Sequence, residues 1–298
     1  MKDNFYSDYI RHQADAEYFG NEIITEFKEL YRETFDEILE EVNSVPLISS
    51  KERLLLLQEY IESVYLELEK TAQERLDKNV GQIVETEKEW LVSYMAKIGV
   101  SYTVSKSLLK NVKFMPVAEK DSYADIIPQL DSRIKKSTSN TLKIAYLTKE
   151  PSENISERLE RQYKRYENYI ETELATMNSA IFRNADYQIF RENNQAVRYS
   201  AVLDFRTCLN CASNSGVLYK ITEAPVLPIH ERCRCFLVPA VIKQDGISSF
   251  SDWIESLSDS DKRKYLGKGR FELYKKGVTP SSFVNDGRII PLSELDDN

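Results

Sequence analysis

Apolar residues in the first part of the chain recur every three to five positions, with charged residues between them. From residue 19 onward these positions are Phe19, Ile23, Phe27, Leu30, Phe35, Ile38 and Val42. Residues with this spacing lie on one face of an α-helix, and such a face packs against a core. The pattern therefore predicts a long amphipathic helix.

A break and a restart follow this first helix. Pro46 interrupts the pattern, and Ser49 or Ser50 can cap a second helix, whose apolar positions again step by three and four. These positions are Leu57, Ile61, Val64, Leu68, Ala72 and Leu76. The pattern predicts either a long antiparallel pair, as in a coiled-coil hairpin, or an ordinary amphipathic core helix.

The periodicity weakens between residues 79 and 149. In this stretch "SYTVSKSLLKNVKF" is compatible with a short helix, and "STSNTLKIAYLTKEPS" with a segment bounded by loops. A further strong helical pattern follows Pro151 and Ser152. Residues 1–196 are therefore predicted to form a helical body of antiparallel long helices.

The character of the sequence changes at Gln195. "AVRYSAVLD", "SGVLYKI" and "CFLVPAV" are short, rich in β-branched residues and bounded by turn residues, which is typical of strands. Helical signals return after Gly246, before the acidic end "LSELDDN". The expected fold is mainly α: a long-helix N-terminal body (1–196), a small α+β module with β-strands and a Cys/His cluster (197–245), and a C-terminal helical segment with an acidic tail (246–298).

Composition supports this expectation and narrows the classes of function. The 298 residues include only nine glycines and nine prolines, a scarcity that favours long helices. The net charge of −8 argues against a globally basic nucleic-acid binder. The charged N-terminus lacks the apolar region of a secretory signal, and the longest aliphatic run is Leu54 to Leu57, so we expect no membrane partner. Synthesis in a reducing cytoplasm is expected, where clustered cysteines more often bind metal than form disulfides.

All four cysteines and one of the two histidines fall within 28 positions. Their order is Cys208-x2-Cys211, eighteen residues, then His230-x2-Cys233-x-Cys235. Zn²⁺ prefers thiolate and imidazole ligands in a tetrahedron, with pairs of ligands supplied by tight turns. Five donors exceed four places, so we expect a structural Zn²⁺ on the first four, with Cys235 as the spare because it starts a strand.

Two other states of the cluster remain open at this point, packed reduced thiols and a disulfide formed after release from the cell. A catalytic role is disfavoured, because a catalytic zinc keeps an open position and the donors here are in excess. Zinc deaminases need H-x-E with P-C-x-x-C, whereas Glu231 follows His230 directly. We expect the protein not to be an enzyme, and we assign no catalytic residue.

The densest positive stretch of the chain lies near its C-terminus. It contains Lys262, Arg263, Lys264, Lys268, Arg270, Lys275 and Lys276. The stretch lacks the spacing of a phosphate-binding loop. It is interpreted either as a solvated helix face or as a contact for DNA or an acidic partner surface.

The segment from "VLDFRTCLNCASNSGVLYKI" to "APVLPIHERCRCFLVPAV" resembles the signature of the tailed-phage minor head proteins, the head-morphogenesis proteins of the phage Mu F-like type. The positions that carry the resemblance are Leu203, Asp204, Arg206, Thr207, Cys208, Cys211, Gly216, Tyr219, Pro228, His230, Cys233, Arg234 and Cys235. Glu231 stands where the family usually has proline. The resemblance covers about residues 195–285, including "LGKGRFELYKKGVTPSSFV". The first two-thirds of the chain resembles the family only in its helical character, without specific motifs.

The resemblance implies a low-copy capsid component that acts in head morphogenesis. It implies synthesis in the cytoplasm of the host bacterium and a place in the virion, inside the head or near the portal. The implied partners are the portal protein, the major capsid or scaffolding protein, and packaged DNA. Asp204, Thr207 and Gly216 are expected to be structural turn residues, with Asp204 or Thr207 capping the turn before Cys208. The alternative is a zinc-module protein that binds or processes phage DNA, such as a nuclease.

Overall fold

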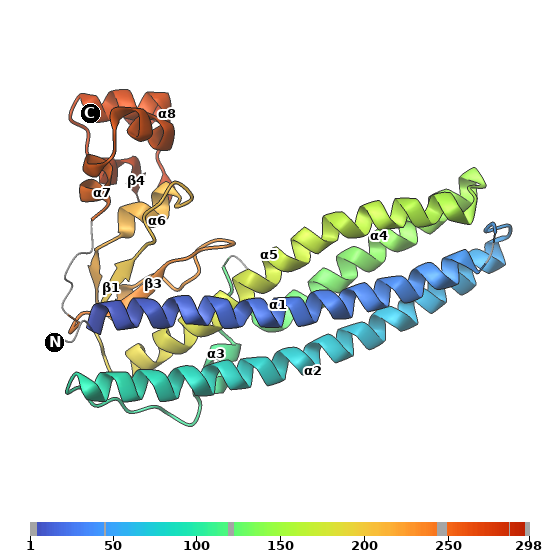
Figure 1. Ribbon diagram of the computed structural model, residues 1–298, viewed down its shortest axis with the longest axis horizontal. Helices are drawn as coiled ribbons and strands as arrows, with labels where there is room; N and C mark the ends of the chain where they lie inside the picture. The colour runs from blue at the N-terminus through green and yellow to red at the C-terminus, as the bar shows by residue number, and fades with distance from the viewer. Residues whose placement is uncertain (1–4, 45, 119–121, 243–248, 286, 296–298) are drawn as a thin grey trace.

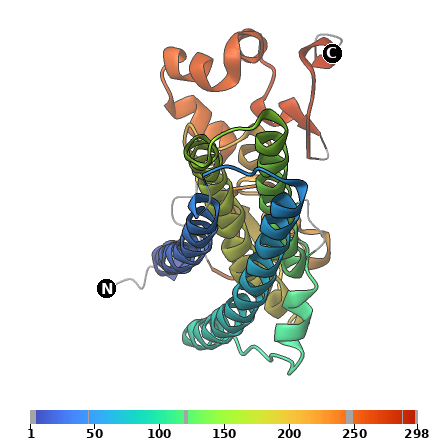
Figure 2. The ribbon, with the colours of Figure 1, turned by 90° about the vertical axis from the view of Figure 1, so that its right-hand side faces the viewer.

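The computed structural model describes residues 5–44, 46–118, 122–242, 249–285 and 287–295. Its long helices form an elongated bundle (Figure 1): α1 (Phe5–Asn43), α2 (Lys51–Lys97), α4 (Ile126–Thr148) and α5 (Ser152–Glu192). Figure 2 looks along this bundle and shows the four helices side by side. The shorter helices are α3 (Leu108–Lys113), α6 (Leu209–Asn214), α7 (Phe250–Ser256), α8 (Asp259–Lys275) and α9 (Leu292–Leu295). The strands are β1 (Val197–Ser200), β2 (Leu218–Tyr219), β3 (Phe236–Pro239), β4 (Val284–Asn285) and β5 (Arg288–Ile289). The expected mainly α fold with a small sheet module is confirmed.

The helices predicted from the first two apolar patterns are present as α1 and α2, and Figure 1 shows that they are antiparallel. Phe27 and Ile38 of α1 are fully buried, as their spacing predicts, whereas Phe19 is 39% exposed at the edge of the apolar face. Ser50 caps α2, because its hydroxyl accepts a hydrogen bond from the backbone N–H of Arg53. The break at Pro46 therefore turns the chain back on itself.

Main-chain contacts join the two helix-to-helix turns at the far end of the bundle. Leu47, between α1 and α2, forms an antiparallel bridge with Pro151, between α4 and α5. The Ser152 N–H donates to the Pro46 carbonyl at 3.1 Å. We call this pair of contacts the tip clasp. It satisfies backbone groups that an open helix end would leave to solvent.

A buried tyrosine–aspartate pair lies inside the bundle between α1 and α4. The Tyr31 hydroxyl donates to Asp131 Oδ1 at 2.5 Å, and Oδ2 has no hydrogen-bond partner in the described part of the chain. Burial raises the pKa of Asp131 to about 7, although the bond from Tyr31 opposes this.

Tyr31→Phe is expected to lower the free energy of unfolding by about 1–3 kcal/mol, since it leaves a buried carboxyl without its donor. Urea unfolding at pH 7 measures this loss. Tyr60→Phe is the matched control, because Tyr60 donates to Glu37 on an exposed part of the surface and its loss should cost little. Equal effects of the two substitutions would contradict the prediction.

The three strands predicted between residues 195 and 242 form an antiparallel sheet in the order β2-β1-β3. Tyr199 of β1 pairs with Leu237 of β3, and both are buried. The sheet rests on the bundle: the Tyr9 hydroxyl of α1 donates to the Leu237 carbonyl at 2.9 Å. One hydrophobic core joins the bundle to the sheet as far as Ile242, so the module is not built around a core of its own.

The C-terminal segment has a second, smaller apolar cluster. Phe250 of α7, Leu266 and Phe271 of α8, and Phe283 pack there against Ala212 of α6. Figure 1 shows this segment beyond the sheet, away from the bundle. The backbone at Gly267 has a φ of +75°, which interrupts α8 with a kink. The predicted boundary at 245/246 and residues 296–298 of the predicted acidic tail lie outside the described residues.

Candidate metal centre

The first pair of cysteines is presented by the start of α6. Cys208 is the N-cap residue of this helix, and its Sγ accepts a hydrogen bond from the Cys211 N–H at 3.3 Å. A C-x2-C spacing therefore places both sulfurs on one helical turn. The cap of α6 is thus Cys208 itself.

Asp204 and Thr207 hold the turn that precedes Cys208. Asp204 Oδ1 accepts from the Arg206 N–H at 2.8 Å, which is an Asx-turn, and the Asp204 carbonyl accepts from the Thr207 N–H at 3.1 Å. The Thr207 hydroxyl donates to the Val202 carbonyl. Both residues act through the backbone of the turn and do not reach the sulfurs.

The second set of donors lies on the turn between residues 230 and 235. The Cys233 N–H donates to the His230 carbonyl at 3.2 Å, and Arg232 adopts a left-handed φ of +54°. Cys235 directly precedes β3. Arg234 ties this turn to the first one through an ion pair with Asp204 at 2.6 Å, which holds the pKa of Asp204 well below its usual range.

Gly216 closes the chain after α6. Its φ of +87° lies in the left-handed region, where a side chain is strained. Its N–H donates to the Tyr199 carbonyl at 2.9 Å and its carbonyl accepts from Arg198 at 3.1 Å. This turn brings the chain from α6 back into β2, beside β1.

All five donors meet in space. The Cys211 sulfur is 3.1 Å from His230 Nε2 and 3.8 Å from the Cys233 sulfur, and Cys208 is 3.3 Å from the same nitrogen. The donors form two groups, Cys208–Cys211–His230 and Cys211–Cys233–Cys235, and within each group the donor atoms lie within 4.8 Å of one another. Cys211 belongs to both groups. The expected spare, Cys235, also lies within 4.8 Å of both Cys211 and Cys233.

His230 is oriented as a ligand would be. Its Nδ1 is 2.7 Å from the Glu231 carbonyl, so this nitrogen carries the proton and donates it. The lone pair of Nε2 then faces the sulfurs. Metal-ligating histidines are fixed in the same way, by a backbone carbonyl on the other ring nitrogen. Burial lowers the pKa of His230, but the Glu231 carbonyl and the neighbouring thiolates raise it more.

The four sulfurs cannot all ionise together without a cation. The hydrogen bonds from Cys211 lower the pKa of Cys208 to about 5 and that of Cys233 to about 2. In return, Cys208 and Cys233 raise the pKa of Cys211 far above its usual range. For Cys235, the contact with Cys211 lowers the pKa, but the contact with Cys233 and burial raise it more. A divalent cation would remove this conflict, because it stabilises every thiolate that ligates it.

The surroundings suit a small, closed site. A cavity of about 20 Å³ opens among the sulfurs, His230 and the neighbouring arginines. Cys211, Cys233 and Cys235 are buried and Cys208 is partly buried, and none of the four is in a disulfide. The Cys/His group can therefore hold one metal ion, with more donors than a tetrahedral ion needs. A metal ion held there would be bound by both turns.

Residues of other elements support the site, and the sequence gives few signs of them. Arg183 of α5 donates from Nε to the Cys235 carbonyl at 3.0 Å. Tyr265 of α8 donates to the Thr207 carbonyl at 2.7 Å. Neither residue has a spacing that relates it to the cysteines. Of the residues that support the site, only Arg234 has a sequence position that points to this role, since it stands between the donors Cys233 and Cys235.

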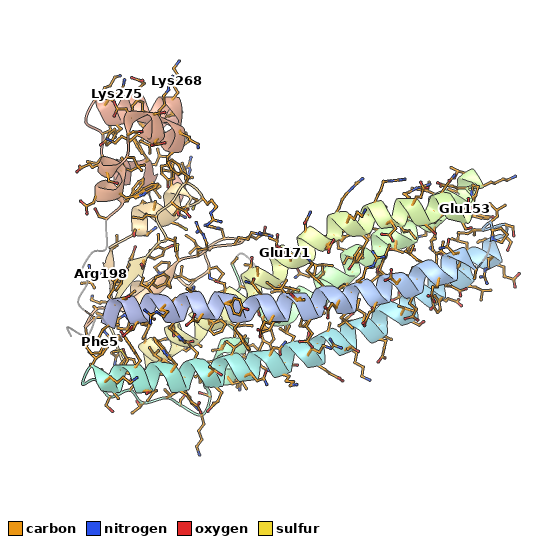
Figure 3. The ribbon with its side chains drawn as sticks, in the orientation of Figure 1. Phe5, Glu153, Glu171, Arg198, Lys268 and Lys275 are labelled. Carbon is orange, nitrogen blue, oxygen red and sulfur yellow. The ribbon has the colours of Figure 1, made fainter. Side chains whose placement is uncertain are left out.

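The basic residues of the C-terminal segment lie on α8 and the turn after it, and none is among the candidate ligands. Lys268 and Lys275 point outward at the end of the molecule (Figure 3). Arg263, Lys264 and Lys276 are also exposed. At least four members have partners within the chain: Lys262, Lys264 and Lys275 lie over the rings of Tyr274, Phe205 and Phe271, and Arg270 donates to the Ile290 carbonyl.

No family model, curated protein or solved structure matches the chain. No helix in the described part of the chain is long and apolar enough to cross a membrane.

Proposed function

We propose that the protein is a minor head component of a tailed bacteriophage that acts in head morphogenesis, with the Cys/His module as a structural metal staple. One observation carries the proposal. The residues that resemble the head-protein signature, which are spread over more than 30 positions, include every donor of one compact cluster and the turn residues that present it.

Within this proposal the metal is Zn²⁺. Two thiolates on a tetrahedral Zn²⁺, each with a bond of about 2.3 Å, lie about 3.8 Å apart. The sulfurs of Cys211 and Cys233 are 3.8 Å apart. The mixed sulfur and nitrogen donors also suit zinc better than a hard cation.

The architecture suits an assembly role near the portal and the head interior. The bundle offers long exposed helix faces to a portal, capsid or scaffolding protein, and the sheet module sits at one end of it (Figure 1). A metal ion that fixes two turns adds stability where a three-stranded sheet contributes few strands.

The alternative, a protein that binds or processes phage DNA, draws its support from the exposed cations of α8. At least four of the seven basic residues already have partners within the chain, which reduces the cationic face. A duplex-binding protein of this kind should lose affinity as salt rises.

The test of the proposal is the composition of particles from the phage that encodes the chain. We expect the protein to co-purify with the portal protein during co-expression and to be present in mature, DNA-filled heads by mass spectrometry. Absence from both the portal complex and the heads would overturn the proposal. If duplex DNA bound instead, and Arg263, Lys268 and Lys276 changed together to Gln abolished that binding, the alternative would take its place.

A further inference from the structure

A cleft of about 470 Å³ lies between the helical bundle and the Cys/His module. Its walls come from α1, from α5 and from the turn at residues 230–234, together with Arg206. This turn reaches over α5, where the Arg232 N–H donates to the Thr176 hydroxyl at 3.0 Å. The cleft is distinct from the small cavity among the sulfurs, although His230 and Cys233 form part of its wall.

The floor of the cleft is apolar. Ala16 and Ile24 of α1 and Phe182 of α5 line it. Between them lies Gly20, where α1 approaches α5 so closely that a Cβ atom would stand 3.4 Å from Cβ of Asn178. The floor therefore suits an apolar side chain better than a hydrated ion.

The rim of the cleft is cationic. The side chains of Arg206, Arg232 and Arg234 are 79%, 56% and 26% exposed. Arg206 contacts Asp204 at 3.4 Å. Arg232 contacts Glu171 at 3.4 Å and donates from Nε to the Thr172 hydroxyl at 3.0 Å. Both side chains are nevertheless mostly exposed, so each guanidinium is accessible to a further ligand. Figure 3 shows Glu171 on α5 near this turn. The one acid among the described lining residues is Glu231, whereas the lining includes the exposed Arg206 and Arg232 and the half-buried Arg234.

We propose that this cleft binds an acidic segment of a partner protein, with an apolar side chain on the floor and carboxylates against Arg206 and Arg232. Arginine presents a planar set of donors that pairs with carboxylate in two parallel hydrogen bonds. The inference deepens the proposed assembly role and rests on it only for the identity of the partner as a head protein.

The floor of the cleft favours a peptide over a nucleic-acid phosphate. Asn178 donates from Nδ2 to the Gly20 carbonyl at 3.2 Å, so its amide closes the floor between α5 and α1. A peptide can place an apolar side chain against Ala16, Ile24 and Phe182 while its carboxylates meet the arginines of the rim. A phosphodiester is charged and has no apolar group for this floor.

The experiment measures binding of a fluorescent probe peptide, acetyl-DDLFED-amide, to the full-length protein by anisotropy. The matched probe is acetyl-NNLFQN-amide, which keeps the apolar residues and removes the charges. We expect the acidic probe to bind at least tenfold more tightly than the neutral one, with the difference shrinking as salt rises. Because only the peptide changes in this comparison, the folding of a variant does not affect it.

Two protein variants locate the binding. Arg206→Glu combined with Arg232→Glu should weaken the acidic probe at least tenfold. Arg161→Glu, at an arginine of similar exposure on α5 away from the cleft, should leave affinity unchanged. Ala175→Trp, which fills the cleft, should abolish binding of the probe while the thermal unfolding curve is retained.

The proposal is overturned if both probes bind equally or if neither binds. It is also overturned if Arg161→Glu weakens binding of the acidic probe as much as the double variant does. A third contrary outcome is displacement of the acidic probe by a single-stranded oligonucleotide whose phosphates are as concentrated as the carboxylates of the probe. If the protein is absent from phage heads but still binds the acidic probe, the proposed head-protein role is wrong and the proposal that the cleft binds an acidic segment stands. The two proposals therefore fail separately.

Discussion

Replacing Cys211 with serine is expected to abolish metal binding and to cost the protein at least about 4 kcal/mol of stability, the contribution of a metal present at a thousand times its dissociation constant. Cys211 is the decisive donor because it belongs to both groups of ligand atoms. Its loss breaks the site whichever of the other sulfurs is the spare. Metal analysis of protein purified under reducing conditions and thermal unfolding followed by circular dichroism measure the two effects.

The matched control is Cys235→Ser. If Cys235 is the spare donor, this variant keeps about one metal per chain and remains sensitive to a chelator. The unaltered protein should melt at a lower temperature after chelation, whereas Cys211→Ser should no longer respond. A folded, metal-free native protein whose melting temperature is indifferent to chelation would show that the cysteines are packed thiols.

The second large effect concerns pH. Glu87 of α2 is buried, its Oε2 lies 2.8 Å from His12 Nε2, and it stands next to Asp186 of α5. Burial raises the pKa of Glu87 from 4.5 to about 7, and burial also lowers the pKa of His12, so neither group favours its charged form. Burial and the Glu87 charge raise the pKa of Asp186 as well, and Arg183 partly opposes this.

The sign of the pH effect follows from proton uptake. Between about pH 4.5 and pH 7 the folded protein keeps a proton on Glu87 that the unfolded chain releases, so stability is full below pH 4.5 and falls as pH rises through 7. The loss amounts to about 3 kcal/mol. Glu87→Gln keeps the shape of the side chain and cannot ionise. The free energy of unfolding of this variant should therefore fall by about 3 kcal/mol less than that of the unaltered protein over this pH range.

Denaturant unfolding of both proteins at pH 5, 6, 7 and 8 makes the comparison, and the difference between the two curves reports the titration of Glu87 together with its effect on Asp186. Glu89→Gln, at an exposed position on the same helix, should follow the unaltered protein throughout. Parallel curves for Glu87→Gln and the unaltered protein would contradict the assignment.

The helices with a clean apolar stripe could be predicted from the sequence, and those with buried polar residues could not. The segment "STSNTLKIAYLTKEPS" (137–152) is expected to be bounded by loops, yet its first twelve residues form the end of α4. Thr138 and Thr141 are buried there, and each hydroxyl bonds the carbonyl four residues earlier, at 3.1 and 3.2 Å. Their polarity is satisfied within the helix, so it interrupts the pattern without interrupting the structure.

The burial of the second half of α5 could not be predicted from the sequence for a related reason. Arg183, Asn184 and Asp186 are all buried, since α1, α3 and β3 pack around this part of the helix. A helix that is enclosed on most sides carries no polar face from which its orientation could be predicted.

In the candidate site, spacing alone indicated the donors, because ligands on tight turns are close in sequence. The pairing of the two turns through Arg234 and Asp204, and the orientation of His230 by a carbonyl, depend on how the sheet folds. His12 and Glu87 are 75 positions apart, on helices whose register the apolar pattern does not define. Such contacts follow only from the packed structure.

The tip clasp has a mechanical consequence. Without it, the α1–α2 and α4–α5 hairpins could slide along each other when a load acts on the far end of the bundle. With Leu47 bridged to Pro151, sliding would have to break the main-chain hydrogen bond from Ser152 to Pro46. The same helix α5 that begins at this clasp contacts the turn of the Cys/His module through Thr176, Ser179 and Arg183. Helix α5 therefore connects the clasped end of the bundle to the turn that carries three of the candidate ligands.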